Sequence, residues 1–369
     1  MTAATSGPVL VVGAGLIGAS VGLRLRAEGV DVRLQDPSRT AVALARDVGA
    51  GRPAAPDDDE PALVVVAAPP DVTAAVVQAQ LEAYPHAVVT DVASVKGHVL
   101  AELRAAGVPL DRYVGSHPMA GRERSGPSAA VPDLFLGRPW VIAEAAESSD
   151  AAVLAVRSLA VDLGAVPVTM GADAHDAAVA AVSHVPQVVS SLVAARLVGV
   201  DEAALGLAGQ GLRDVTRIAA SDPELWTSIL AANAAAVRPV LEGLRADLDG
   251  VIAALAAADD ATGPETVGAG VLVTIARAIA AGNEGVARIP GKHGGAHRAY
   301  EEVTVLVPDS PGELARLLSE VGESGVNLED LRLEHAAGRQ VGMAVISVLP
   351  GSATKLEWEL SERGWRLVV

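Results

Sequence analysis

Short apolar runs alternate with helical patterns along the first part of the chain. Residues 8–12 form a β-branched run that predicts a buried strand, and residues 19–28 continue with helical spacing. Residues 30–34 alternate between apolar and polar side chains, which predicts a second strand. Further strands are predicted at residues 63–68, 87–90, 140–142 and 166–170. Strands that alternate with helices predict the α/β class, with a Rossmann-type, doubly wound parallel sheet.

The pattern changes at about Asp173, where the strand signals stop. Ala-, Leu- and Val-rich stretches favour helix instead, at residues 177–197, 223–248 and 268–281. Because these stretches are apolar on every side, we expect them to pack against one another and against a second copy of the chain. The sequence therefore predicts an all-helical domain that pairs in a homodimer.

The C-terminal part returns to a mixed pattern after a Gly-, Pro- and basic-rich stretch at residues 288–295. That stretch is a tether or, alternatively, a segment that reaches an active site. Beyond it the order β-α-β-β-α-β predicts a small ferredoxin-like module, at residues 302–307, 311–324, 327–335, 340–349, 353–363 and 365–369. The predicted parts are a sheet domain at 1–171, a helical domain at 172–287, a linker at 288–299 and a C-terminal domain at 300–369.

Composition narrows the class of partner. The net charge of −17 disfavours nucleic acid and anionic membranes, since phosphate backbones need stripes of Lys and Arg. The absence of cysteine excludes disulfides and thiolate metal sites. We expect no run long and apolar enough to cross a bilayer and no signal peptide, and hence a cytoplasmic protein.

A glycine pattern follows the first predicted strand. Residues 13–18 read Gly-Ala-Gly-Leu-Ile-Gly, in which Gly13 allows a tight turn, Gly15 admits a pyrophosphate and Gly18 lets helix and strand pack closely. Leu16 and Ile17 open the predicted helix, whose first N–H groups favour phosphate. Asp36 ends the second strand, where its carboxylate suits the 2′-hydroxyl of NAD. The segment predicts an NAD site; the neighbouring Arg39 leaves room for NADP, and a turn without nucleotide is the alternative.

Polar or Pro-rich segments follow the later predicted strands at 63–68 and 87–90. Ala68 and Pro69 end one strand at the carboxyl edge, where open α/β sheets bind ligands. Ser94 follows the next strand, and His117 lies in the segment after that. These segments converge beside the nicotinamide if NAD binds as predicted. From position alone, His117 is either a base or a loop residue, and Ser94 either a site residue or a helix cap.

Together, five segments resemble prephenate dehydrogenase and its arogenate-using relatives over residues 8–290. They are the glycine pattern at 13–18, TDVASVKG at 90–97, GSHPMAG at 115–121, SHVPQ at 183–187 and RDVTRIAASDPELW at 213–226. The resemblance implies an oxidative decarboxylation of a cyclohexadiene. Hydride leaves the ring carbon bearing the hydroxyl and passes to NAD⁺, while the ring carboxylate departs as CO₂ and the ring becomes aromatic.

The resemblance also implies roles for individual residues. His117 takes the hydroxyl proton as hydride leaves, which suits a neutral imidazole, and Ser94 helps to orient both His117 and the substrate hydroxyl. Arg217 binds a substrate carboxylate, whereas Arg213 is structural. Trp226 lines the substrate site or, alternatively, packs in the core. No set of histidines and carboxylates has metal-ligand spacing, so no metal is expected.

Ser183, His184 and Gln187 complete the predicted substrate site. His184 and Gln187 lie about one turn apart on one helix, so both can face the cleft, with Pro186 early in that helix or kinking it. Some prephenate-using relatives have His at the position of Gln187. A neutral amide there accommodates the amino group of arogenate, so the choice of substrate stays open. His175 is expected only to start a helix.

The C-terminal module has a resemblance of its own. Residues 307–334 look like an ACT domain, a small-molecule sensor common on enzymes of amino-acid biosynthesis. In such domains an amino-acid site borders the turn that opens the first helix and the entry to the second strand, which places Asp309, Pro311, Gly312 and Asn327 at that site. Tyrosine is the expected effector. A module that stabilises or dimerises the chain and binds nothing is the alternative.

These observations predict a homodimeric, NAD-dependent prephenate dehydrogenase of tyrosine biosynthesis, producing 4-hydroxyphenylpyruvate and regulated through an ACT domain. No segment before the first strand remains for a fused chorismate mutase. The nearest alternative is an arogenate dehydrogenase that makes tyrosine directly. A β-hydroxyacid dehydrogenase is more distant, because such enzymes use a Lys on the helical domain in place of the set Ser94, His117 and Arg217. A non-catalytic amino-acid sensor is the alternative from another class.

Overall fold

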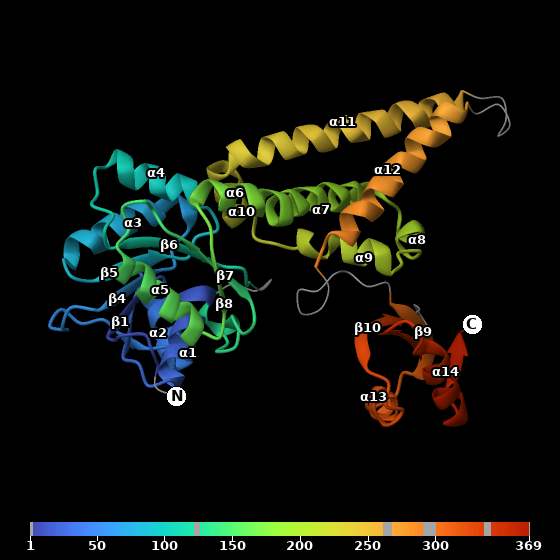
Figure 1. The fold of residues 1–369 in the computed structure, drawn as a ribbon, viewed down its shortest axis with the longest axis horizontal. Helices are drawn as coiled ribbons and strands as arrows, with labels where there is room; N and C mark the ends of the chain where they lie inside the picture. The colour runs from blue at the N-terminus through green and yellow to red at the C-terminus, as the bar shows by residue number, and fades with distance from the viewer. Residues whose placement is uncertain (1–2, 122–125, 261–267, 291–299, 336–340, 369) are drawn as a thin grey trace. The chain divides into compact units, whose positions relative to one another are not determined.

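The computed structural model describes residues 3–121, 126–260, 268–290, 300–335 and 341–368 (Figure 1). The chain forms two compact units, one of residues 1–199 with 215–244 and one of residues 200–214 with 245–369. The boundaries predicted at residues 171, 287 and 299 stay predictions, and residues 291–299 of the predicted linker lie outside the described residues.

The first unit contains an eight-stranded sheet in the order β3-β2-β1-β4-β5-β6-β7-β8. Its strands are β1 Val9–Val12, β2 Val32–Gln35, β3 Arg52–Pro53, β4 Leu63–Val66, β5 Val88–Asp91, β6 Tyr113–Pro118, β7 Pro139–Ala143 and β8 Val166–Thr169. Strands β1 to β6 pair in parallel, and the order reverses between β1 and β4, as expected of a doubly wound sheet. Two strands were not predicted: β3, which has only two residues, and β6.

The sheet departs from parallel pairing at one end. β7 pairs antiparallel with β6, and β8 pairs parallel with β7. A parallel return from β6 would need a crossover of a dozen or more residues, usually a helix. Between β6 and β7 the described residues contain only the 3₁₀ turn Pro127–Ala129. The chain therefore returns in the opposite direction.

Helices cover both faces of this sheet (Figure 1). They are α1 Leu16–Ala27, α2 Arg39–Asp47, α3 Pro70–Ala83, α4 Gly97–Ala105 and α5 Asp150–Asp162. Along β1, Val9 and Val11 join a core cluster with residues of α1, α2 and α5, whereas Leu10 and Val12 join a second cluster with residues of α3 and α4. Because successive side chains of a strand point to opposite faces, a strand that is apolar throughout requires cover on both sides.

A long helix follows the sheet. It consists of α6 Ala172–Val179, a π-helical turn Ala180–His184 and α7 Val185–Arg196, and ends in the 3₁₀ turn Leu197–Gly199. Pro186 is the second residue of α7, directly after the π turn, so helical backbone lies on both sides of it. The N–H that it lacks is therefore one that an uninterrupted α-helix would use. We expected no apolar run long enough to cross a bilayer, and this is wrong. Among the described residues one helix, Ala172–Gly199, is both long enough and apolar enough to do so, judged by length and composition alone. It also carries buried polar side chains that hydrogen-bond within the first unit, among them His175, Asp176 and Gln187.

The predicted helix over residues 223–248 is two helices, α10 Pro223–Ala232 and α11 Ala234–Asp259. They meet at Asn233, whose backbone (φ −107°, ψ 21°) ends α10. The Asn233 side chain donates to the backbone oxygen of Asp176 at 2.9 Å. A tertiary contact thus sets the break, which helix propensity alone does not reveal.

The second unit holds α8 Glu202–Leu205, most of α9 Gln210–Thr216, α12 Ala269–Ala287 and the C-terminal module. In that module β9 Glu301–Pro308, β10 Leu328–His335, β11 Val341–Val348 and β12 Arg366–Val368 form an antiparallel sheet in the order β10-β11-β9-β12. Its helices are α13 Glu313–Glu323 and α14 Ala353–Glu362, and their Leu317 and Leu356 are fully buried. The predicted ferredoxin-like arrangement is confirmed.

Candidate active site

The glycine turn after β1 has the geometry that its sequence predicts. Gly13 has φ +107°, and a Cβ there would lie 2.3 Å from the carbonyl oxygen of Ala67. A Cβ on Gly18 would lie 1.9 Å from the carbonyl oxygen of Gly13. Both positions therefore exclude larger residues, the first by conformation and contact and the second by helix–strand packing.

Gly15 differs, because a Cβ there would meet nothing within 4 Å. It immediately precedes α1, in which Leu16 and Ile17 are the first residues, and no side chain caps that helix end. The first backbone N–H groups of a helix lack intrahelical partners and attract phosphate. The open space above Gly15 thus fits a pyrophosphate.

Asp36 lies beside this turn at the end of β2. Its Oδ2 accepts a hydrogen bond from the Ala14 N–H at 2.8 Å, and its Oδ1 accepts one from the Ser38 N–H at 2.7 Å. Ala68 and Pro69 lie at the end of β4, on the other side of β1 from β2, where Thr73 Oγ1 donates to both of their carbonyl oxygens. The predicted cofactor residues therefore meet at one edge of the sheet. The first N–H groups of α1 fit a pyrophosphate and the Asp36 carboxylate fits a ribose hydroxyl, so together they fit a dinucleotide.

His117 lies on β6, paired with Val141 of β7, so the alternative of a loop residue is wrong. The side chain is partly exposed. Its Nδ1 lies 2.9 Å from Nε2 of His175, and the two rings meet edge to face with centroids 5.1 Å apart. A neighbour that sequence reasoning did not assign to the site therefore fixes His117.

His175 is not merely a residue at a helix start, as the sequence predicted. It is fully buried on α6, and its Nδ1 lies 2.8 Å from Oδ1 of Asp176. The two oxygens of Asp176 also accept hydrogen bonds, each 2.8 Å long, from the backbone N–H groups of Lys96 and Gly97. The consecutive His-Asp pair at 175–176 is a signal in the sequence, but its partners are about 60 to 80 residues away and leave no local pattern.

A buried ion pair lies beneath this network. Lys96 Nζ pairs with Oδ1 of Asp91 and donates to the backbone oxygen of Ser116 at 2.8 Å, and the Tyr113 hydroxyl donates to Oδ2 of Asp91 at 2.7 Å. Burial lowers the pKa of Lys96, against the opposing charge of Asp91. Burial and the Asp91 charge raise the pKa of Tyr113. Sequence reasoning missed this pair, although its members flank Ser94 in the segment 90–97.

The helical side of the site centres on His184, which is 1% exposed. Its Nδ1 lies 3.0 Å from Nδ2 of Asn233, and its ring meets that of Trp226 edge to face at 5.9 Å. Burial lowers the pKa of His184 to about 4, against the charge of Asp176 and with a further contribution from His175. His184 is therefore a neutral, packed residue.

The remaining predicted substrate residues lie on or beside α7. Gln187 is buried and donates through Nε2 to Ser221 Oγ and, at 3.4 Å, to Ser191 Oγ. Ser183 is half-buried on the π turn, and Arg217 is exposed at the start of the 3₁₀ turn Arg217–Ala219, which packs on α7. Ser94 is half-buried between β5 and α4, and no hydrogen bond joins it to His117 within the described part of the chain.

The environment of His117 favours the neutral imidazole. Burial lowers its pKa well below the ordinary 6.5, and the nearby His175, Lys96 and His184 lower it further. A histidine that is neutral at physiological pH and partly exposed at a ligand-binding edge can accept a proton. Within the described residues no group of three or more His, Cys, Asp or Glu could hold a metal ion.

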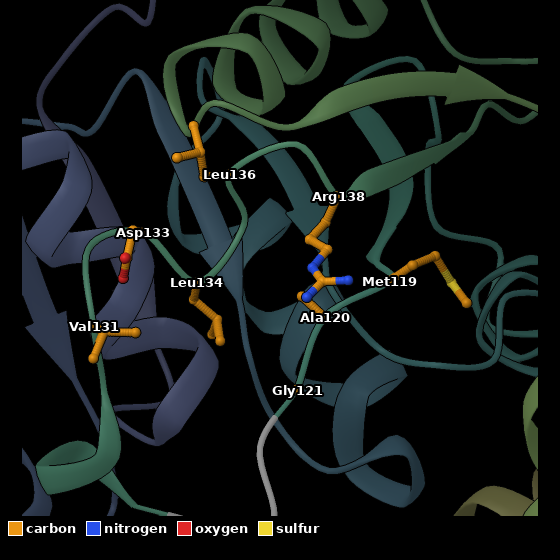
Figure 2. Close-up of a pocket in the computed structure, with 8 residues that line it drawn as sticks. All are labelled: Met119, Ala120, Gly121, Val131, Asp133, Leu134, Leu136 and Arg138. Atoms are coloured by element: carbon orange, nitrogen blue, oxygen red, sulfur yellow. The ribbon is translucent and has the colours of Figure 1, made fainter. Parts of the chain in front are cut away.

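A cavity of about 550 Å³ adjoins the end of β6 (Figure 2). Met119, Ala120 and Gly121 line one side of it, directly after His117 and Pro118. Residues of the segment that leads into β7 line the other side, namely Val131, Asp133, Leu134, Leu136 and Arg138. Figure 2 shows Arg138 among the residues that line this cavity, so a cation lines it. Sequence reasoning did not single out this segment.

A dinucleotide-type glycine turn and a low-pKa histidine at one edge of a doubly wound sheet define the class of Rossmann-type dehydrogenases. Family models identify the member of this class. The model of the prephenate dehydrogenase nucleotide-binding domain matches residues 21–169, and the model of the prephenate dehydrogenase dimerization domain matches residues 171–263. The chain belongs to the prephenate dehydrogenase family.

Individual relatives agree. The chain is 38% identical to the probable prephenate dehydrogenase NovF of Streptomyces niveus over 96% of this chain and 98% of that protein. Prephenate dehydrogenase of Aquifex aeolicus, solved with hydroxyphenyl propionate and NAD⁺, is 25% identical with a TM-score of 0.63, over 75% of this chain and 97% of that one. Arogenate dehydrogenase of Synechocystis is also 25% identical, with a TM-score of 0.59, over 75% of this chain and 99% of that one.

The two glycines of the turn predict opposite effects. Gly15→Ala meets open space, so we expect the urea midpoint to stay unchanged while the affinity for NADH falls at least about tenfold, because the methyl occupies the pyrophosphate position. Gly18→Ala meets the Gly13 carbonyl, so we expect unfolding to become easier by on the order of 1–3 kcal/mol. Urea unfolding and NADH fluorescence titration measure both. Equal loss of stability in the two variants would contradict the assignment of Gly15.

The buried ion pair predicts a large asymmetry in stability. Lys96→Met leaves the Asp91 carboxylate buried without its cation, which costs roughly 3–5 kcal/mol of unfolding free energy. The double variant Lys96→Met/Asp91→Leu should recover part of that loss. Arg104→Met is the matched control, because the Arg104–Glu147 pair is exposed and solvent screening leaves it a small contribution. Urea unfolding compares the four proteins, and a Lys96→Met effect no larger than the control would disprove the pairing.

Proposed function

We propose that the protein catalyses the NAD-dependent oxidative decarboxylation of prephenate to 4-hydroxyphenylpyruvate. The observation that carries the proposal is His117: a neutral, partly exposed histidine at the carboxyl end of β6, held from behind by His175. The glycine turn and Asp36 at the same edge fit NAD, and the Aquifex relative was solved with NAD⁺ and a hydroxyphenyl acid.

The mechanism assigned to this site needs a proton acceptor for the substrate hydroxyl. The glycine turn and Asp36 would hold NAD⁺, which would supply the acceptor for the hydride that leaves the ring carbon carrying this hydroxyl. His117 takes the hydroxyl proton as the hydride leaves, and the carbon–carboxylate bond then breaks with release of CO₂. The electron pair of that bond makes the ring aromatic, and the proton on His117 returns to the resulting phenolate oxygen. The reaction thus consumes no net proton.

Other residues hold the substrate in this proposal. Arg217 binds a substrate carboxylate from the turn that packs on α7, and Ser94 orients the hydroxyl from the segment after β5. Ser183 and Gln187 contact the substrate from the helical side. A bidentate Arg–carboxylate contact is strong enough to hold an anionic substrate on an acidic protein.

Arogenate is the second candidate substrate, and Gln187 favours it. Nε2 of Gln187 already donates to Ser221 Oγ, so the carbonyl oxygen Oε1 is left as the acceptor of this amide. Arogenate carries an ammonium group where prephenate carries a keto oxygen, and an ammonium is a donor. The similarity to the Synechocystis arogenate dehydrogenase accords with this alternative.

The proposal includes a tyrosine site on the C-terminal module and a homodimer. Asp309, Pro311 and Gly312 lie exposed at the start of α13, where Gly312 has φ +94°, and Asn327 lies exposed before β10. On α11, Leu248, Ile252 and Leu255 are 53–55% exposed at helical spacing, which leaves an apolar stripe for a second copy. A dimer on this stripe accords with the dimerization-domain match.

Initial rates of NAD⁺ reduction test the function. We expect turnover of prephenate, suppressed by tyrosine, and a fall of about 10²–10⁴-fold in kcat for His117→Asn with NADH binding retained. Prephenate and arogenate are assayed in parallel, each with and without tyrosine. Turnover of arogenate alone would replace the substrate and keep the mechanism. No turnover of either would overturn the proposal.

The pH dependence of kcat/KM tests the state of His117. Only the neutral imidazole accepts a proton, and its pKa lies below 6.5, so activity should persist as the pH falls through 6.5 and decline only below that value. Initial rates between about pH 4.5 and pH 8 define the acid limb, with tryptophan fluorescence at each pH as the control for unfolding. An acid limb above pH 6.5 in folded enzyme would contradict the lowered pKa of His117.

A further inference from the structure

The structure assigns to His175 and Asp176 a positioning role that the sequence did not indicate. We infer that these two residues fix the tautomer of His117, so that Nδ1 of His117 carries its proton and Nε2 is the atom that accepts the substrate proton. The inference deepens the proposed function and rests on it for its consequence in catalysis. The tautomer itself is a property of the free protein.

The argument begins at Asp176, which can only accept. Burial alone would raise its pKa, but hydrogen bonds from His175 and from the backbone N–H groups of Lys96 and Gly97 outweigh burial and lower it. The side chain is therefore an ionised carboxylate with no proton to donate. The proton in its 2.8 Å contact with His175 must accordingly lie on Nδ1 of His175.

The same reasoning continues from His175 to His117. A neutral imidazole with its proton on Nδ1 has a lone pair on Nε2, which makes that nitrogen an acceptor. His175 Nε2 lies 2.9 Å from Nδ1 of His117, so His117 must donate through Nδ1. The lone pair of His117 then lies on Nε2, the nitrogen on the far side of the ring from His175.

The groups around His117 explain why this arrangement survives proton transfer. His175 from α6, Lys96 from the segment before α4 and His184 from the π turn all disfavour a charge on His117, while Asp91 partly neutralises Lys96. Once Nε2 accepts a proton, Nδ1 still donates to His175, whose other nitrogen is held by the Asp176 carboxylate. The donor pattern is the same before and after the transfer, so no side chain has to reorient.

The backbone around Asp176 is built for this contact. A Cβ on Gly97 would lie 2.8 Å from Oδ2 of Asp176, so only glycine lets the carboxylate approach both N–H groups at the start of α4. Asn233 donates to the backbone oxygen of Asp176 at 2.9 Å and fixes that turn of α6 from the other side. The carboxylate is thus held in one orientation before any substrate binds.

Nitrogen-15 NMR of the histidine-labelled full-length protein tests the tautomer directly. A protonated imidazole nitrogen and one with a lone pair resonate in separate regions of the spectrum, and His117→Asn identifies the signals of His117. In the wild-type protein at neutral pH we expect the His117 proton on Nδ1 and the lone pair on Nε2. The opposite assignment would overturn the inference, whichever substrate the enzyme uses.

Variants connect the tautomer to catalysis. Asp176→Asn replaces one carboxylate oxygen, an acceptor, by an NH₂ group, a donor. At the Oδ1 position this donor faces His175 and the Lys96 N–H, and at the Oδ2 position it faces the Gly97 N–H. We expect the His117 proton to move toward Nε2 and kcat to fall by about 10²–10⁴-fold, because an analogous Asp→Asn change in the serine-protease triad acts through the wrong tautomer. KM and the affinity for NADH should change less than about threefold. Asp173→Asn, an exposed carboxylate three residues earlier on the same helix, is the matched control and should leave kcat within about twofold.

His175→Gln is the conservative rescue. Its amide oxygen can accept from His117 Nδ1, so this variant should retain more activity than His175→Leu, which cannot accept. If Asp176→Asn fails to fold, this pair and the wild-type spectrum still decide the question. Equal activity of the Gln and Leu variants, or unchanged kcat in a folded Asp176→Asn whose spectrum shows the His117 proton on Nε2, would show that His175 and Asp176 are structural only. Absence of turnover in the wild type, with the expected spectrum, would instead overturn the proposed function.

Discussion

The carboxylate of Asp176 is the contact on which the rest of the site depends. It accepts two backbone N–H groups at the start of α4 and holds His175, which in turn holds His117. Its own backbone oxygen accepts from Asn233, the residue that also contacts His184. The carboxylate of Asp176 therefore joins α6 to the sheet domain and sets the geometry of His175 and His117. Because a buried carboxylate is costly without partners, this saturation by donors is what permits the helix to dock.

The Lys96–Asp91 pair adds specificity beneath that contact at a cost in desolvation. Lys96 contributes to two layers at once: its backbone N–H donates to Asp176, and its ammonium donates to the backbone oxygen of Ser116 on β6. The strand that carries His117 and the helix that carries His175 are thus fixed by one residue. Buried pairs seldom increase stability over apolar packing, so this pair is better explained by the contacts through which Lys96 joins β6 to α6 than by a gain in stability.

Much of the fold followed from the sequence, because its causes are local. The glycines at 13, 15 and 18 and the acid at 36 lie close along the chain, and each has a separate steric or electrostatic reason to be there. The strand and helix order of the C-terminal module follows from periodicity and turn residues in the same way. His117 itself was identified from a motif, and its neutral state followed from the chemistry that the motif implies.

What the sequence could not supply depends on distant contacts. The helix break at Asn233 and the role of His175 arise from partners some 50 to 80 residues away, and the direction of β7 depends on a connection without a crossover helix. Side chains of this kind are indistinguishable in sequence from an ordinary buried histidine or a helix-interior amide. Local propensity is a weak guide wherever tertiary contacts decide the outcome.

The π turn at Ala180–His184 shows how the helix reconciles these demands. In a regular α-helix of 3.6 residues per turn, Asp176 and His184, eight residues apart, would point about 80° away from each other. A π turn bonds i to i+5 and holds more residues per turn, which rotates His184 back toward the side that Asp176 occupies. Asn233 can then reach both residues, and His184 packs on Trp226. The less favourable helix geometry is retained because it brings two buried polar groups to one partner, and such turns are frequent at functional sites for this reason.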